Sequence, residues 1–140
     1  GMQKLNGYKD AILAHDLSLD ESLMQICVNN IQETKKLLLH LQENGLTFDA
    51  VVAAEDALAV GAIKFATEKG YHIPSDIEII GYNNSILATC CDPELSSIDN
   101  HVETLCITTI NTLMRVLVDS DVPNKTTISN DLIIRKTTNF

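Results

Sequence analysis

The feature that most constrains the fold is an alternation of helical and strand-like segments between residues 31 and 80. Residues 31–43 carry apolar side chains at helical spacing, and residues 57–69 do so again. The apolar runs 48–54 and 77–80 have the length of strands, and each follows one of these helices. Strands that are apolar throughout and are separated by helices are typical of a parallel sheet covered on both faces.

The flanking segments extend this pattern with further helices and short strands. We expect a helix over 7–15, a short strand around Met24–Val28, a long helix over 101–118 and one or two closing strands within 126–137. The chain has 140 residues and a hydrophobic content of 45 %, which is enough to bury a core. The expected fold class is therefore α/β, with a parallel sheet flanked by helices.

Each apolar run of the alternating unit gives way to polar residues that suit a binding site. Glu55 and Asp56 follow the run 48–54, and Asn83 follows 77–80 after a glycine and a tyrosine. Parallel α/β sheets bind ligands beyond the carboxyl ends of their strands, and a right-handed crossover points neighbouring strands in the same direction. We therefore expect Glu55 and Asn83 to lie close together, where carboxylate and amide groups suit the hydroxyls of a polyol or sugar.

A purely structural role accounts for the same residues, so both explanations stay open. Aspartate is a preferred residue at the start of a helix, and capping of the following helix is the favoured explanation for Asp56. For Glu55 and Asn83, a simple turn and a ligand contact fit the pattern about equally well.

The charge and hydropathy of the chain exclude two classes of partner. The formal net charge is −9 and the ten basic residues are scattered, which argues against direct binding to the phosphates of nucleic acid. No apolar run approaches the roughly 20 residues of a membrane span, and the N-terminus lacks the apolar region of a signal peptide. We expect no membrane association.

The residues that usually carry metal or covalent chemistry show no functional spacing. The four cysteines lack C-x-x-C spacing, which favours reduced thiols in a cytoplasmic protein. The four histidines lack the spacing of metal ligands, and the chain has no phosphate-binding glycine loop and no nucleophile elbow. We therefore expect no metal site, no cofactor, no catalytic residues and no enzymatic activity.

A small apolar patch is predicted away from the strand ends. Val60 falls outside the arc of helix 57–69 that faces the sheet, and Leu87 and the Cys90–Cys91 pair lie in the irregular segment after the second strand. One exposed valine is ordinary by itself. Together, these residues would form a patch suited to self-association.

Three stretches resemble the effector-binding core of LacI-type bacterial transcription repressors. They read "FDAVVAAEDALAVGAIKFATEKGYHIPSDIEIIGYNNS", "DPELSSIDNHVETL" and "DLIIRKTT". The family typically places Asn/Asp-Asp-x-x-Ala-x-Gly-Ala after one strand and Gly-(Tyr/Phe)-Asp-(Asp/Asn) after the next. The resemblance covers about residues 4–138, and the motifs are specific in combination rather than singly.

The resemblance implies a truncated fragment of a two-subdomain core with a flavodoxin-like, periplasmic-binding-protein-like fold. Residues 1–92 would form most of the C-terminal effector-binding subdomain. Residues 93–140 would supply the crossover, a helix and a strand of the N-terminal subdomain, and a returning strand. The implied function is binding of a sugar or small metabolite and homodimerisation in a cytoplasmic repressor, with DNA contacted only by an absent helix-turn-helix headpiece. The alternative is a sugar-binding protein of a transport system with the same fold.

The ligand contacts of the family carry over by position. Glu55 falls at its usual Asn or Asp, Asn83 at the Asp of Gly-Tyr-Asp, Lys4 at a common Arg, and Asn29 near an aromatic that stacks on sugar. All four differ from the commonest residue, so the charge pattern of the ligand is left open. Asp56 is a fifth candidate because of its place after the strand. The resemblance also aligns three positions with the dimer interface of the family: Val60, Leu87 and Cys91.

Overall fold

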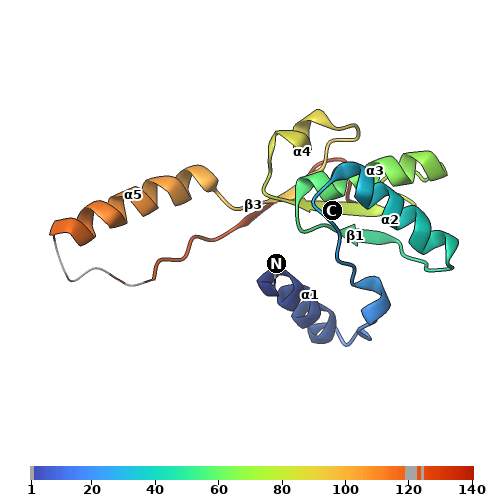
Figure 1. Ribbon diagram of the computed structural model, residues 1–140, viewed down its shortest axis with the longest axis horizontal. Helices are drawn as coiled ribbons and strands as arrows, with labels where there is room; N and C mark the ends of the chain where they lie inside the picture. Colours follow the sequence, from blue (N-terminus) through green and yellow to red (C-terminus); the bar gives the residue numbers. More distant parts are fainter. Residues whose placement is uncertain (1, 119–122, 124) are drawn as a thin grey trace.

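The structure, a computed structural model, describes residues 2–118, 123 and 125–140. Figure 1 shows a small sheet with helices packed beside it and one long helix that extends away from it. The elements follow the order α1 (Met2–Ala14), the 3-10 helix η1 (Glu21–Leu23), α2 (Ile31–Glu43), β1 (Ala50–Val52), α3 (Asp56–Lys69), β2 (Glu78–Tyr82), α4 (Ile86–Cys90), β3 (Ser96–Asp99), α5 (Val102–Val118) and β4 (Asp131–Ile133).

The four described strands form one mixed sheet in the order β1-β2-β3-β4. β1, β2 and β3 are parallel, and β4 adds to β3 as an antiparallel edge strand. After β4 the chain turns back beside β2, where the backbone N–H of Ile79 donates to the carbonyl of Thr137 at 2.9 Å. The predicted α/β class with a parallel sheet is thus confirmed, with one antiparallel strand at the edge.

Local sequence signals set the ends of α2 and α3. Asn30 caps α2, because its side-chain oxygen accepts the backbone N–H groups of the second and third helical residues. Gly45 follows the end of α2 with a φ of 87°, and Gly70 ends α3 with a φ of 74°. Both are left-handed conformations that glycine adopts without strain. The N-cap of α3 is Glu55 instead of the expected Asp56, and its side chain makes no capping bond.

The core lies between the sheet and a layer of two helices. α3 packs on β2 on one side and against α2 on the other, which explains why side chains are buried nearly all round α3. Phe65, Ala62 and Ile79 are fully buried at the centre of this layer. At Gly61, an added Cβ atom would stand 2.6 Å from the carbonyl oxygen of Ile31, so α2 and α3 cross in close backbone contact.

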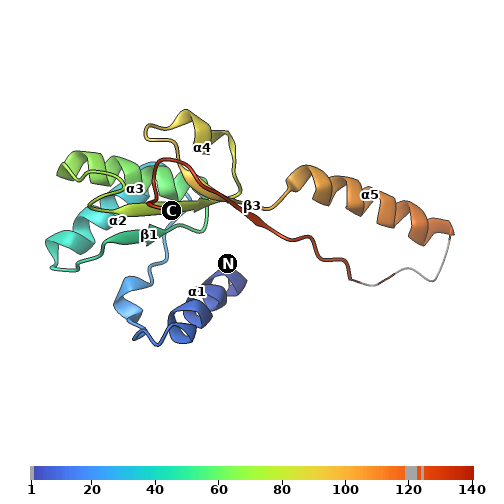
Figure 2. The same ribbon diagram turned by 180° about the vertical axis from the view of Figure 1, so that it is seen from behind.

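Two parts of the chain bury little surface. Figures 1 and 2 show α1 on the opposite side of the sheet from α2 and α3, and none of its residues is buried. The expected coverage of both sheet faces therefore holds for one face only. α5 also has no buried residue. It exposes nine large apolar side chains: Val102, Leu105, Ile107, Ile110, Leu113, Met114, Val116, Leu117 and Val118.

The short strand expected around Met24–Val28 does not form. These residues carry no regular structure, and Ile26 is 98 % exposed. An apolar run becomes a strand only when a neighbouring strand satisfies its backbone groups. No strand in the described part of the chain pairs with this segment. The strand expected over 77–80 forms and is longer than expected at its carboxyl end. β2 continues beyond Ile80 through Gly81 to Tyr82.

Candidate functional site

A polar cluster lies where β1 and β2 end side by side. Val52 pairs with Ile80 in the parallel ladder, so the residues that follow each strand emerge at the same edge of the sheet. The side-chain amide of Asn83 donates to the Oε2 atom of Glu55. The structure thus brings Glu55 and Asn83 into direct contact, although they are 28 positions apart in the sequence.

Lys4 of α1 joins this strand-end cluster from the other side of the sheet. Its Nζ atom donates to the carbonyl of Ala54 at 2.7 Å and lies 3.4 Å from Oε1 of Glu55. The same ammonium group stands 3.6 Å from the centroid of the Tyr82 ring, a cation–π contact. The cluster therefore combines a carboxylate, an amide, a cation and an aromatic ring, which together can bind a hydroxylated ligand.

The backbone at Asn83 adopts a conformation that few residues tolerate. Its φ is 102° and that of Asn84 is 47°, a region in which asparagine is enriched. The backbone N–H of Asn83 donates to the carbonyl of Ile98 at 2.8 Å, and its side-chain oxygen accepts Nδ2 of Asn100 at 3.1 Å. The strained turn therefore explains why Asn83 and Asn84 are both asparagines, and the hydrogen bonds of their side chains are a second reason.

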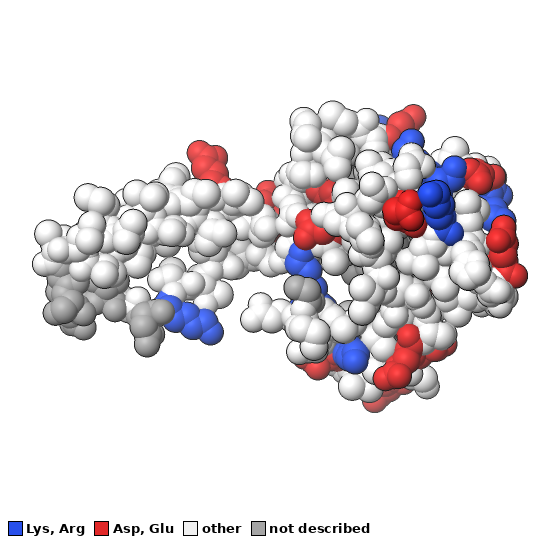
Figure 3. Space-filling model, viewed as in Figure 1, with Lys and Arg blue, Asp and Glu red and all other residues white. Residues whose placement is uncertain are grey.

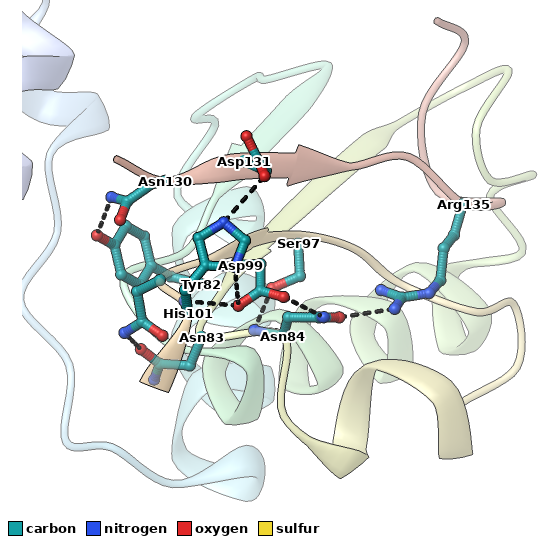
Figure 4. A network of polar contacts seen from close by, with 10 residues as sticks. Tyr82, Asn83, Asn84, Ser97, Asp99, His101, Asn130, Asp131 and Arg135 are labelled. Carbon is teal, nitrogen blue, oxygen red and sulfur yellow. Dashed lines mark hydrogen bonds and ion pairs between the residues drawn. The ribbon is translucent and has the colours of Figure 1, made fainter. Parts of the chain in front are cut away.

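Asn84 is the centre of a second polar network, which Figure 4 shows. Its amide nitrogen donates to Oδ2 of Asp99 at 3.0 Å, and its amide oxygen accepts Nη2 of Arg135 at 2.6 Å. The backbone N–H of Asn84 donates to Oγ of Ser97 at 3.0 Å. Asn84 thus connects the end of β2 with β3 and with the segment after β4.

Sequence reasoning missed several members of these networks. Asn100 and Tyr82 contact the strand-end cluster, and Asn130 donates to the Tyr82 hydroxyl at 2.9 Å. The position of Asn100 just after β3 was an available signal, because it marks a third parallel strand end at the same edge. Asn130 gave no signal, since its contact depends on the antiparallel placement of β4.

The carboxylate of Asp56 faces the protein interior. Asp56 is 2 % exposed. Its Oδ1 atom accepts the Ser97 hydroxyl and its Oδ2 atom accepts the backbone N–H of Ser85, both at 2.6 Å. The side chain therefore ties the start of α3 to β3 and to the start of α4, instead of capping its own helix or joining Glu55 in the strand-end cluster.

Asn29 lies apart from the other ligand candidates. It is exposed and precedes the N-cap of α2. No hydrogen bond or ion pair between described residues links Asn29 to Glu55, Asn83 or Lys4. Its assignment to the ligand site stays a prediction.

The three residues predicted for self-association line one groove. Val60, Leu87 and Cys91 border a groove of about 610 Å³ between α3 and α4. Val60 is only 8 % exposed, so the expectation of an exposed valine was wrong. Gln32 and Lys35 of α2 also line this groove. Burial raises the pKa of the Cys91 thiol, and its Sγ atom donates to the carbonyl of Pro93 at 3.3 Å.

Asp99 is the titratable group of the network with a resolved shift. The backbone N–H of His101 donates to its carboxylate, and this bond, followed by that from Asn84, holds the pKa of Asp99 below its ordinary value of 3.8. Because the folded pKa lies below the unfolded one, the contribution to stability is complete above the unfolded pKa and is lost as pH falls through the folded pKa.

Replacing Asp99 with asparagine should make the free energy of unfolding less dependent on pH under acid conditions. The variant is expected to be less stable than the wild type at pH 7 and to lose less further stability between pH 4 and pH 2.5. Urea titrations followed by circular dichroism would measure both effects. Asp10→Asn on the exposed side of α1 is the control. Equal acid sensitivity of Asp99→Asn and the wild type would contradict the assignment.

Features of metal or membrane proteins are absent from the described residues. No group of three or more His, Cys, Asp or Glu side chains is arranged to hold a metal ion within residues 2–118, 123 and 125–140. In the same ranges, no helix combines the length and the apolar character needed to cross a membrane.

Comparison with known proteins identifies the family. The sequence model of the periplasmic binding protein-like domain matches residues 4–138. An HTH-type transcriptional regulator of Lachnoclostridium phytofermentans is 69 % identical over 140 residues, which are all of this chain and 42 % of that protein. The HTH-type transcriptional regulator AscG of Escherichia coli is 31 % identical over 134 residues, 96 % of this chain and 40 % of AscG.

Solved structures agree with the sequence comparison. The crystal structure of the E. coli repressor AscG superimposes with a TM-score of 0.87 at 30 % identity, covering 97 % of this chain and 49 % of that one. A sugar-binding transcriptional regulator of the LacI family from E. coli, complexed with phosphate, gives a TM-score of 0.88 at 31 % identity, with 97 % and 49 % covered. The chain spans about two fifths of the length of the curated relatives cited. It belongs to the periplasmic binding protein-like domain family, in the form found in LacI-type transcriptional regulators.

Proposed function

We propose that this chain is part of the effector-binding core of a LacI-type transcriptional regulator and binds a hydroxylated small molecule, most simply a sugar. The observation that carries the proposal is the contact of Glu55, Asn83 and Lys4 at the carboxyl ends of β1 and β2. Carboxylates accept hydrogen bonds from hydroxyl groups, and amides both donate and accept them. This edge of the sheet is where α/β folds bind ligands.

The relatives support this assignment. The two curated relatives cited above are HTH-type transcriptional regulators, and one structural neighbour is described as sugar-binding. A regulator of this type binds DNA through a separate headpiece, which fits the net charge of −9 on this chain. All of these relatives are described as transcriptional regulators, so they favour a regulator over the alternative of a transport-system binding protein.

We further propose that residues 1–92 form most of the C-terminal subdomain of the core and that residues 93–140 reach into the N-terminal subdomain. The exposed apolar surface of α5 supports this division, because a helix with nine exposed large apolar residues requires a partner surface. The groove bordered by Val60, Leu87 and Cys91 is proposed as the surface for homodimerisation.

Replacing Asn83 with alanine in the full-length regulator should weaken effector binding by about tenfold or more without unfolding the protein. The variant loses the amide that contacts Glu55 in the proposed ligand site, and one hydrogen bond of about 1.4 kcal/mol corresponds to a tenfold change. Calorimetry with the sugar that gives the largest thermal shift in a screen of mono- and disaccharides would measure the effect.

The control for this experiment is Asn6→Ala, which removes an exposed asparagine of α1. It should leave both affinity and melting temperature unchanged. If Asn83→Ala kept full affinity, the strand-end cluster would not be the effector site. If it lost stability in proportion to affinity, Asn83 would serve the turn alone.

A further inference from the structure

Two carboxylates face each other across the strands that join the sheet to α5. In the antiparallel register, Asp99 of β3 is the direct partner of Asp131 of β4. Like charges directly opposite each other destabilise a strand pair. The pair therefore needs a compensating group.

His101 supplies this group. Its Nε2 atom lies 2.9 Å from Oδ2 of Asp131 and its Nδ1 atom lies 3.9 Å from Oδ1 of Asp99. The ring is held in place because the backbone N–H of His101 donates to the Asp99 carboxylate at 2.8 Å and its φ is 49°. Figure 4 shows the imidazole between the two acids. The side chain of His101 is 32 % exposed.

The contact between His101 and Asp131 lies at the junction of β3, β4 and α5. His101 stands between β3 and α5, and Asp131 begins β4, so the contact joins the outgoing and returning strands at the base of α5. Figures 1 and 2 show that α5 and residues 125–130 before β4 project together from this point. Loosening the contact would allow the two strands to separate at the base of α5.

Two hydrogen bonds and one peptide bond connect His101 to Asn83 of the strand-end cluster. Asp99 accepts from Asn84 at 3.0 Å, and Asn84 follows Asn83, which donates to Glu55. Among the described residues, the carboxylates within 4 Å of the His101 ring are those of Asp99 in β3 and Asp131 in β4. Arg135 acts on Asp99 from the far side of Asn84. A change at His101 thus reaches Asn83 through two side chains.

We propose that His101 is a proton-dependent clamp between β3 and β4 that regulates the turn carrying Asn83 and Asn84. The imidazolium form bridges Asp99 and Asp131 and closes the junction. The neutral form can satisfy only one acceptor with its single N–H, which leaves the two carboxylates facing each other. Acid conditions therefore order the junction and the turn. That this regulates effector binding rests on the function proposed above for the strand-end cluster.

The test follows the turn directly by NMR in the full-length regulator, without any effector. The side-chain amide of Asn84 and the backbone amides of β4 should shift together between pH 5.5 and pH 8. Hydrogen-exchange protection of β4, corrected for intrinsic rates, should fall about threefold over this range, as expected for a partly exposed ion pair. His101→Asn should abolish both effects. Asparagine tolerates the positive φ, so this variant keeps the backbone.

Two further variants make the result specific. Asp131→Asn removes one acid and should reduce the transition at Asn84 even if His101→Asn proved unstable. His72→Asn is the matched control, because His72 also contacts an aspartate, Asp76 at 3.0 Å, but in a turn remote from the network. A transition at Asn84 that persists in His101→Asn, or that disappears in His72→Asn, would overturn the clamp. Since no effector is used, this outcome is independent of the Asn83→Ala binding experiment.

Discussion

Replacing Asp56 with alanine is expected to lower the free energy of unfolding by about 3 kcal/mol. The side chain is 2 % exposed, and its two oxygens accept the Ser97 hydroxyl and the Ser85 backbone N–H at 2.6 Å. Alanine would leave both donors buried or half-buried without a partner, and each loss costs about 1–3 kcal/mol. Urea denaturation followed by circular dichroism would measure the change.

Two further substitutions test whether the loss comes from the hydrogen bonds of Asp56 or from any change at this end of α3. Asp56→Asn keeps an acceptor for Ser85 and can donate to the Ser97 oxygen, so it should cost less than half as much. Glu55→Gln removes the neighbouring charge, whose side chain is 37 % exposed, and should change stability by less than about 1 kcal/mol. If Asp56→Ala and Glu55→Gln lowered the free energy of unfolding equally, the hydrogen bonds of the buried Asp56 carboxylate would not be the source of stability.

Replacing Gly61 with alanine should destabilise the protein by about 1–3 kcal/mol. The added Cβ atom would stand 2.6 Å from both the carbonyl oxygen of Ile31 and the Cβ atom of Thr34. Neither is the end of a flexible side chain, so α2 and α3 would have to move apart at the centre of the core. This cost outweighs the gain of about 1 kcal/mol that alanine brings to a helix interior.

The same substitution at Gly7 provides the control for the helical gain. Gly7 lies within α1, and an added Cβ atom there would meet nothing within 4 Å. Gly7→Ala should therefore leave stability unchanged or raise it by up to about 1 kcal/mol. Thermal denaturation of both variants would reveal the difference. A Gly61→Ala protein as stable as Gly7→Ala would mean that α2 and α3 can separate at little cost.

Gly81 illustrates how the meaning of a residue changes once its neighbours are known. After an apolar run, a glycine suggests a turn, yet Gly81 lies within β2. An added Cβ atom would overlap Oδ1 of Asp56 and stand 2.7 Å from a methyl group of Leu95. The glycine is needed for space, because the buried carboxylate of Asp56 approaches the strand at this point.

Local pattern was sufficient for the elements that depend on nearby residues. The periodicity of 31–43 and 57–69 predicted α2 and α3 close to their observed bounds, and the apolar runs before Glu55 and Asn83 predicted β1 and β2. The contact between Glu55 and Asn83 could also be predicted, because the handedness of a β-α-β crossover follows from chain chirality. The LacI-type family was recognisable from the same residues.

The sequence by itself therefore determined the alternation of elements, the edge of the sheet at which the polar cluster lies, and the family. Tertiary structure alone decided that Asp56 is buried, that Val60 is buried beside a groove and that Met24–Val28 does not form a strand. It also decided that His101 meets Asp131, 30 positions away. Helix and strand periodicity reports only on neighbours within a few residues, whereas burial and hydrogen-bond partners are set by segments that the fold brings together from far along the chain.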